Sequence, residues 1–139
     1  MSENKTLSIA VLGLGRFGKY VAKELFENGA DLLLADKDEE VINQMSEIAD
    51  MAVACDLADP EAIEKLGLGN MNIVIIAMGS SLESSIMCTT IAKEQGVHKV
   101  IAKAGNERMG KVLKKLGADE IIYPEKTMAH LTVTHIVNK

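Results

Sequence analysis

Six short apolar segments alternate with amphipathic ones along the whole chain, and this alternation limits the folds open to it. Some, such as "NIVIIAMG", are apolar throughout, as in strands buried on both faces. Parallel strands need long crossovers, which helices supply on both faces of the sheet. The pattern predicts an α/β fold, a Rossmann-like doubly wound parallel six-stranded sheet in the order 3-2-1-4-5-6, with strands near residues 7–15, 31–36, 50–55, 72–79, 99–104 and 119–124.

The segments between the strands space their apolar residues as one face of a helix does. On that spacing we expect Phe26 to face the core from the first helix and Leu116 from the helix after 99–104. In the helix after 72–79, the expected inward positions include Ile86 and Thr90.

The last helix, expected over residues 124–139, does not fit this pattern. Met128, Leu131, Val133 and Ile136 point in too many directions for one buried stripe, so the helix needs cover on more than one side. We therefore divide the chain into a domain over residues 1–123 and an interface helix over 124–139. A second copy of the chain or an absent downstream domain would cover that helix.

Composition excludes several classes of protein. The chain has 139 residues, 47% of them hydrophobic, which suits one domain with a substantial core. A net charge of −5 and 3% aromatic residues argue against a nucleic-acid partner. With no signal segment and no apolar run near the roughly 20 residues that span a bilayer, we expect a cytoplasmic protein. Cys55 and Cys88 lack zinc-binding spacing and are expected to be reduced thiols.

Three glycines follow the first strand in the stretch "GLGRFG". Gly13 permits a tight turn, Gly15 lets backbone N–H groups approach a pyrophosphate, and Gly18 allows the helix to pack closely on the sheet. The start of a helix also favours negative charge. The motif predicts a phosphate-binding loop that includes Leu14, Arg16 and Phe17.

Asp36 ends the second strand, 18 positions after Gly18, close to the roughly 20 expected for the acid that accepts hydrogen bonds from a ribose. Its alternative role is to cap the next turn. In "ADKDEE" the carboxylates crowd the place of a 2′-phosphate, so repulsion disfavours NADP despite Lys37. The motif and Asp36 together predict an adenine nucleotide with free ribose hydroxyls.

Other candidate ligand contacts lie where later strands end, because ligands of open α/β sheets bind at the carboxyl ends of the strands. Asp56 is placed to accept from an adenine amino group, or else to cap a turn. Arg16 is placed either to pair with phosphate or to lie in solvent. The further candidates are Cys55, Leu57, Ala77, Met78, Gly79, Lys103 and Glu125.

No catalytic constellation accompanies this site. His98, His130 and His135 do not form a set, and no nucleophile elbow, Walker A lysine or zinc-protease motif occurs. We therefore expect no enzyme. The alternative is the NAD-binding domain of an oxidoreductase that lacks its substrate domain, for which Lys103 is the one candidate proton-transfer residue at the rim.

Several blocks, in this order, carry a family resemblance: "AVLGLGRFGKYVAKEL", "DKDEEVINQ", "IVIIAMG" and "KVLKKLGADEIIYPEKTMA". The chain resembles the N-terminal (TrkA-N) half of RCK, regulator of potassium conductance, domains, in particular the regulatory subunits of Ktr/Trk-type potassium uptake systems. The resemblance implies a cytosolic regulator at the inner face of the membrane that gates a potassium-translocating subunit. It further implies homodimers that form an octameric ring when the C-terminal half is present, and binding of ATP or ADP, or of NAD, NADH or AMP.

The same resemblance implies roles for single residues. Gly13, Gly15 and Gly18 would hold the phosphates and Asp36 the ribose, while Arg16 would reach a terminal phosphate, including that of a neighbouring subunit. The remaining implied contacts are Asp56 near adenine, Lys103 beside the phosphates and Glu125 as ligand of a divalent cation. The chain departs from the family at "CDLAD", where a "GDAT"-like run is usual, and before "PEK", where histidine is more common.

Overall fold

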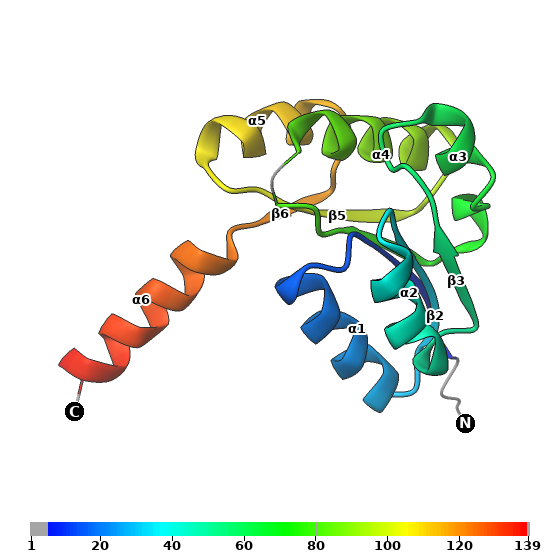
Figure 1. Cartoon of the computed structure of the whole chain (residues 1–139). Coiled ribbons are helices and arrows are strands. Elements are labelled where there is room, and N and C mark those ends of the chain that lie inside the picture. Colours follow the sequence, from blue (N-terminus) through cyan, green and yellow to red (C-terminus); the bar gives the residue numbers. More distant parts are fainter. Residues whose placement is uncertain (1–5, 80, 139) are drawn as a thin grey trace, which may run out of the picture.

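The computed structural model describes residues 6–79 and 81–138, and within them six parallel strands form one sheet (Figure 1). The strand order is β3-β2-β1-β4-β5-β6, which confirms the predicted Rossmann-like topology. The strands are shorter than their apolar runs, because the last residues of each run form loops. Their bounds are Ser8–Leu12 (β1), Asp31–Asp36 (β2), Met51–Ala54 (β3), Ile73–Ile76 (β4), Lys99–Lys103 (β5) and Glu120–Ile122 (β6).

Helices cover both faces of the sheet, as Figure 1 shows, with α1 and α2 on one side and α3, α4 and α5 on the other. The structure adds two short 3₁₀ helices, η1 and η2, that the apolar spacing did not predict. The helical bounds are Arg16–Glu27 (α1), Glu39–Met45 (α2), Ser46–Ile48 (η1), Pro60–Glu64 (α3), Leu68–Asn70 (η2), Leu82–Glu94 (α4), Glu107–Lys115 (α5) and Pro124–Val137 (α6).

Each side of the sheet has its own apolar core. Along β1, Ile9 and Val11 belong to the core with α1 and α2, whereas Ala10 and Leu12 belong to the core with α3, α4 and α5. Successive side chains of a strand point to opposite faces, so a strand covered on both faces must be apolar at every position. This is the physical reason for the uninterrupted apolar runs in the sequence.

Side-chain acceptors fix the register at the amino ends of three strands. Asp50, directly before β3, accepts from the Leu32 amide at 2.9 Å, and its own amide donates to the Leu32 carbonyl at 2.9 Å. The same pair of bonds joins two further couples, Asn72 with Ser8 and Asp119 with Val100. We call these three pairs the register clamps. The bond from the Val100 amide also lowers the pKa of Asp119.

Two predicted inward side chains are exposed, and two more are only half-buried. Phe26 is 48% exposed and Leu116 is 38% exposed. Both lie at the end of a helix, where spacing fitted to the helix interior does not fix the direction of the side chain. Ile86 and Thr90 are half-buried, and Ile86 packs against the core as predicted, while the fully buried positions of α4 include Ser85, Cys88, Thr89 and Ala92. Because α4 is apolar or uncharged nearly all round, its sequence does not distinguish the inner face.

The final helix α6 projects away from the rest of the molecule (Figure 1). Its apolar side chains are largely open to solvent, with Leu131 52%, Ile136 64% and Val137 67% exposed. No helix among the described residues has both the length and the apolarity to cross a membrane.

The start of α6 is packed against α5 through Tyr123, which precedes α6, and Gly110. A Cβ atom on Gly110 would collide with the Tyr123 hydroxyl and lie 3.1 Å from Ile121 Cγ2. We therefore expect Gly110→Ala to lower the free energy of unfolding by about 1 to 3 kcal/mol. In a helix without this neighbour, the same change would raise it by about 1 kcal/mol.

Urea unfolding followed by circular dichroism measures this difference. Tyr123→Phe in the Gly110→Ala chain should recover part of the loss, because it removes the colliding oxygen. A more stable Gly110→Ala chain would show that the Tyr123 ring moves aside freely.

Candidate functional site

The loop between β1 and α1 begins with a turn that only glycine suits. Gly13 has φ +96°, a conformation that residues with side chains rarely adopt, and its amide donates to the Ala35 carbonyl at 2.8 Å. A Cβ atom there would lie 2.8 Å from Met78 Sδ and 2.9 Å from the Met78 amide nitrogen. The turn therefore brings the ends of β1, β2 and β4 together.

The fold requires glycine at position 18 of the motif but not at position 15. A Cβ atom on Gly18 would collide with the Gly13 carbonyl oxygen, so the fold itself needs this glycine. Gly15, the N-cap of α1, has φ −71° and nothing within 4 Å of where its Cβ would stand. No described part of the chain thus requires glycine at position 15. The open space beside it is where a ligand could approach the amides at the start of α1.

The Asp36 carboxylate connects this loop to the next one. One oxygen accepts from the Leu14 amide at 2.6 Å and the other accepts from the Asp38 amide at 2.9 Å. The turn-closing role weighed for Asp36 is therefore present. The side chain still lines the cavity described next, and each carboxylate oxygen keeps a second lone pair for a further donor.

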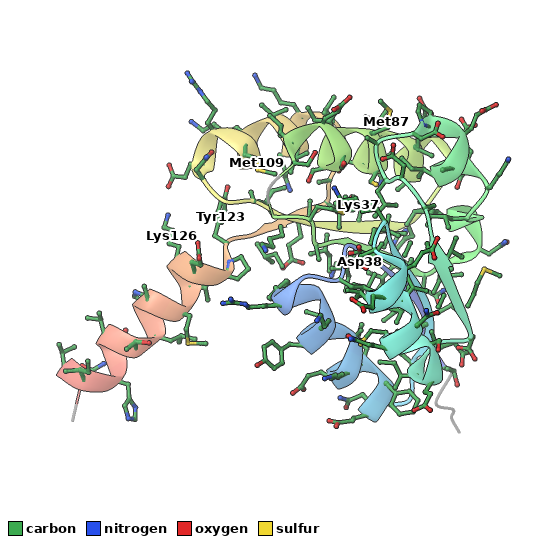
Figure 2. All side chains as sticks on the ribbon, viewed as in Figure 1. Lys37, Asp38, Met87, Met109, Tyr123 and Lys126 are labelled. Carbon is green, nitrogen blue, oxygen red and sulfur yellow. The ribbon has the colours of Figure 1, made fainter. Side chains whose placement is uncertain are left out.

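A cavity of about 570 Å³ lies at the carboxyl ends of the strands, and we call it the main cavity. It brings together most of the predicted site residues, and it adds Ala58, Ser81 and Ser84. The predicted residues in its wall are Gly13, Leu14, Gly15, Asp36, Lys37, Asp56, Leu57, Ala77, Met78, Gly79 and Lys103. Figure 2 shows Lys37 directed into the space between the two helical layers.

A second cavity, of about 460 Å³, adjoins the main cavity through two shared residues, Gly79 and Lys103. It contains three more of the predicted residues, Arg16, Phe17 and Glu125. Residues that the sequence did not predict complete its wall: Ala104, Gly105, Asn106, Glu107, Tyr123, Pro124 and Lys126.

Lys103 forms the boundary between the two cavities. Its Nζ lies 5.6 Å from the centre of the Phe17 ring, within the range of a cation–π contact. A Cβ atom on Gly79 would come within 2.8 Å of that Nζ, so glycine at position 79 leaves room for the ammonium group. The ammonium group is thus placed where a ligand extending from one cavity into the other must pass it.

Two predicted site residues lie outside both cavities. Gly18 is buried behind the loop, as its packing role requires. Cys55 instead lines a separate hollow of about 250 Å³ beside β3 and α3. Burial, followed by the nearby carboxylates of Asp56, Asp36 and Asp59, raises the pKa of its thiol. The Cys55 thiol is therefore neither in the main cavity nor readily ionised.

The residues missed by sequence analysis fall into two groups. Ser81 is the N-cap of α4 and accepts from the Ser84 amide at 3.2 Å. The pair could have been found, since it follows β4, which neighbours β1 where the strand order reverses. Glu107 and Lys126 have no local motif, because they meet only when α5 and α6 are in place, 2.9 Å apart.

The glycine pair Gly15 and Gly18 gives a matched test of this site. Gly15→Ala should leave the free energy of unfolding unchanged or raise it slightly, while weakening adenine-nucleotide binding at least about tenfold, since the methyl group takes the space of a phosphate. Gly18→Ala should lower the free energy of unfolding by about 3 kcal/mol because of the collision with the Gly13 carbonyl.

Urea unfolding and isothermal titration with ATP measure the two effects separately. Undiminished ATP binding by the Gly15→Ala chain would show that no ligand approaches this loop.

Comparison with known proteins assigns the chain to a family. The TrkA-N domain family matches residues 9–124. Ktr system potassium uptake protein C of Bacillus subtilis (strain 168) is 43% identical over 129 residues, covering 93% of this chain and 58% of that protein. Ktr system potassium uptake protein A of Vibrio alginolyticus is 37% identical, covering 94% and 59%. The chain thus spans less than two thirds of these relatives.

Solved structures share the fold at low sequence identity. The TrkA-N domain of the inner membrane protein ybaL from Escherichia coli has a TM-score of 0.81 and 16% identity, covering 94% of this chain and 97% of that one. The Kef C-terminal domain of Shewanella denitrificans in AMP-bound form scores 0.71 at 21% identity, covering 94% and 79%. The GsuK channel bound to NAD scores 0.71 at 12% identity, covering 88% and 22%. With the match over residues 9–124 and the Ktr relatives, the chain belongs to the TrkA-N domain family.

Proposed function

We propose that this chain is the nucleotide-sensing part of a cytosolic regulatory subunit that gates a membrane potassium transporter by binding ATP or ADP. The observation that carries the proposal is the pair of adjoining cavities, one with the open Gly15 loop and Asp36, the other with Arg16, Lys103 and Lys126. The chain is similar to Ktr system potassium uptake proteins, which supports the transport role.

In this proposal the nucleotide lies along both cavities. Asp36 accepts hydrogen bonds from the ribose hydroxyls, and adenine lies near Asp56 and Leu57. The first phosphates lie over the amides from Gly13 to Gly15, beside the positive end of α1. A terminal phosphate then reaches Lys103 and Arg16.

The charges of the second cavity favour a polyphosphate over a dinucleotide. A nicotinamide ring would have to enter a space lined by Arg16, Lys103, Glu107, Glu125 and Lys126. Cationic side chains bind phosphate oxygens well, whereas they repel the positively charged ring of oxidised nicotinamide and offer little to its neutral carboxamide. ATP and ADP are therefore our proposed ligands ahead of NAD and NADH, although the GsuK channel binds NAD and the Kef domain binds AMP.

Glu125 is our proposed ligand for a divalent cation beside the phosphates. It lines the second cavity at the start of α6. No group of three potential protein ligands occurs within residues 6–79 and 81–138. The phosphates themselves, water or a second subunit would therefore complete the coordination, as is usual for magnesium with nucleotides.

The output in this proposal is a change in how subunits pack. Energy for gating comes only from a difference in nucleotide affinity between two arrangements, typically about 5- to 150-fold. The apolar exposed surface of α6 would form a homodimer, and such dimers would assemble into a larger ring when the C-terminal half is present. The whole subunit would then contact its potassium-translocating partner at the inner face of the membrane.

Arg16 tests the proposed sensing of phosphate number. Arg16→Ala should reduce the preference for ATP over ADP about tenfold, because a charge-assisted bond to the terminal phosphate is lost. AMP affinity should stay within twofold of the unmodified chain. Isothermal titration with ATP, ADP and AMP measures all three affinities, and an unchanged preference would remove Arg16 from this role.

The exposed apolar face of α6 tests the proposed assembly. Leu131→Asp should weaken self-association at least about tenfold, because the carboxylate would be buried in the dimer contact. Met51→Asp is a matched control, since Met51 is 54% exposed on β3, away from α6. Light scattering over a range of concentrations measures the mass, and a strictly monomeric unmodified chain would contradict the proposed dimer.

A further inference from the structure

The direction of α6 depends on very few contacts with the rest of the protein. Apart from Pro124 and Thr134, which are half-buried, every described residue of α6 is exposed. Lys126 Nζ lies 2.9 Å from a Glu107 carboxylate oxygen at the start of α5. Among the described residues, this is the one side-chain hydrogen bond between α6 and another element. Figure 2 shows Lys126 and Tyr123 at the base of α6.

The Lys126 ammonium has a second set of neighbours. It lines the second cavity, as do Arg16 and Lys103, and lies 5.7 Å from the centre of the Tyr123 ring. Glu107 lines the same cavity. The hydrogen bond with Lys126 lowers the pKa of Glu107 and so favours the ionised carboxylate. An anion in this cavity and the Glu107 carboxylate thus face the same ammonium group.

We propose that Glu107 and a nucleotide phosphate in the second cavity compete for Lys126. A nucleotide whose phosphate chain is long enough to reach Lys126 then releases α6 from α5. Lys126 and Glu107 are positioning residues in this scheme. Tyr123 stays packed on Gly110 and serves as the pivot. The scheme rests on the proposed nucleotide binding for the identity of the anion, and it adds a route from the ligand to the helix.

The ion pair has the strength that such competition needs. The Lys126 and Glu107 side chains are 69% and 70% exposed. Ion pairs that are this exposed favour the paired arrangement of the two side chains over the separated one only about two- to fivefold. A phosphate that carries more than one negative charge can therefore displace the Glu107 carboxylate. A strongly held pair would keep α6 in place whatever the ligand.

A double-mutant cycle measures the competition in the 139-residue chain. Glu107→Gln should tighten ATP binding about two- to fivefold, because Lys126 becomes free for phosphate. Lys126→Gln should weaken it by a similar factor. In the Lys126→Gln chain, the gain from Glu107→Gln should disappear. AMP, whose single phosphate does not reach Lys126, should bind all four chains equally in isothermal titration.

The Lys99–Glu120 pair serves as the matched control. Its atoms are 3.6 Å apart, its side chains are 46% and 51% exposed, and it joins the amino ends of β5 and β6, away from both cavities. Glu120→Gln makes the same charge change as Glu107→Gln and should leave ATP affinity unchanged. If both variants tighten ATP binding equally, the effect comes from the change in net charge alone, and the proposal is overturned.

The same double-mutant cycle distinguishes competition for Lys126 from simple repulsion between the Glu107 carboxylate and phosphate. If Glu107→Gln tightens ATP binding as much in the Lys126→Gln chain as in the unmodified chain, the carboxylate acts directly and the competition is wrong. If the unmodified chain binds neither ATP nor AMP, the proposed nucleotide function fails instead, and the distance measurement below still tests what holds α6.

Spin labels on exposed positions follow the helix directly. Lys23→Cys on α1 and His130→Cys on α6 place labels at exposed positions of two helices whose first residues line the second cavity. Only Cys55 needs replacement, because Cys88 is fully buried and burial raises the pKa of its thiol to about 12. Diluting labelled chains with unlabelled ones removes distances between subunits.

The pair distance should favour one value in the unliganded chain and with AMP, with a minor population at other values, because the exposed ion pair favours the docked geometry only about two- to fivefold. It should be broad or displaced with ATP and in the Lys126→Gln chain without ligand. A distribution identical in the unmodified and Lys126→Gln chains would show that the ion pair does not hold α6.

Discussion

The register of the parallel sheet is the constraint on which the rest of this structure depends. A strand buried on both faces has no polar side chain with which to mark its register, so slipping by two residues would still bury apolar groups. The register clamps before β3, β4 and β6 remove that ambiguity with paired backbone and side-chain bonds. They act at the amino ends, and the register that they set there aligns the carboxyl ends of the strands.

At that aligned edge, one carboxylate organises the site. Asp36 holds the loop from β1 and the loop to α2 through two backbone amides, so the floor of the main cavity is formed before any ligand arrives. Preformed sites lose less entropy on binding. The second cavity differs, because its walls come from α1, α5 and α6, and α6 is the least supported element. In the binding that we propose, a preformed half-site in the main cavity would thus be paired with an adjustable one in the second cavity.

Much of this could be predicted from sequence, for reasons that particular residues make clear. Gly13, Gly18 and Asp36 act within one strand–helix–strand unit, from β1 through α1 to the end of β2, and local spacing identifies them. Glu107 and Lys126 meet across two helices, so no short pattern contains both. For α4, spacing predicts Thr90 inward whereas Thr89 is the fully buried one, because small or apolar residues lie on every side of this helix and spacing is informative only where polar residues mark the opposite face. Cys55 was assigned from its neighbours in sequence, while its side chain lines another hollow.

The empty space beside Gly15 has a consequence for reading other members of the family. Positions 13 and 18 are held to glycine by the architecture, so they should persist in any descendant that still folds. The fold does not require glycine at position 15, so this position is free to acquire a side chain once selection for ligand binding ends. A family member with glycine at positions 13 and 18 and a bulky residue at position 15 would have an intact fold but would have lost its ligand.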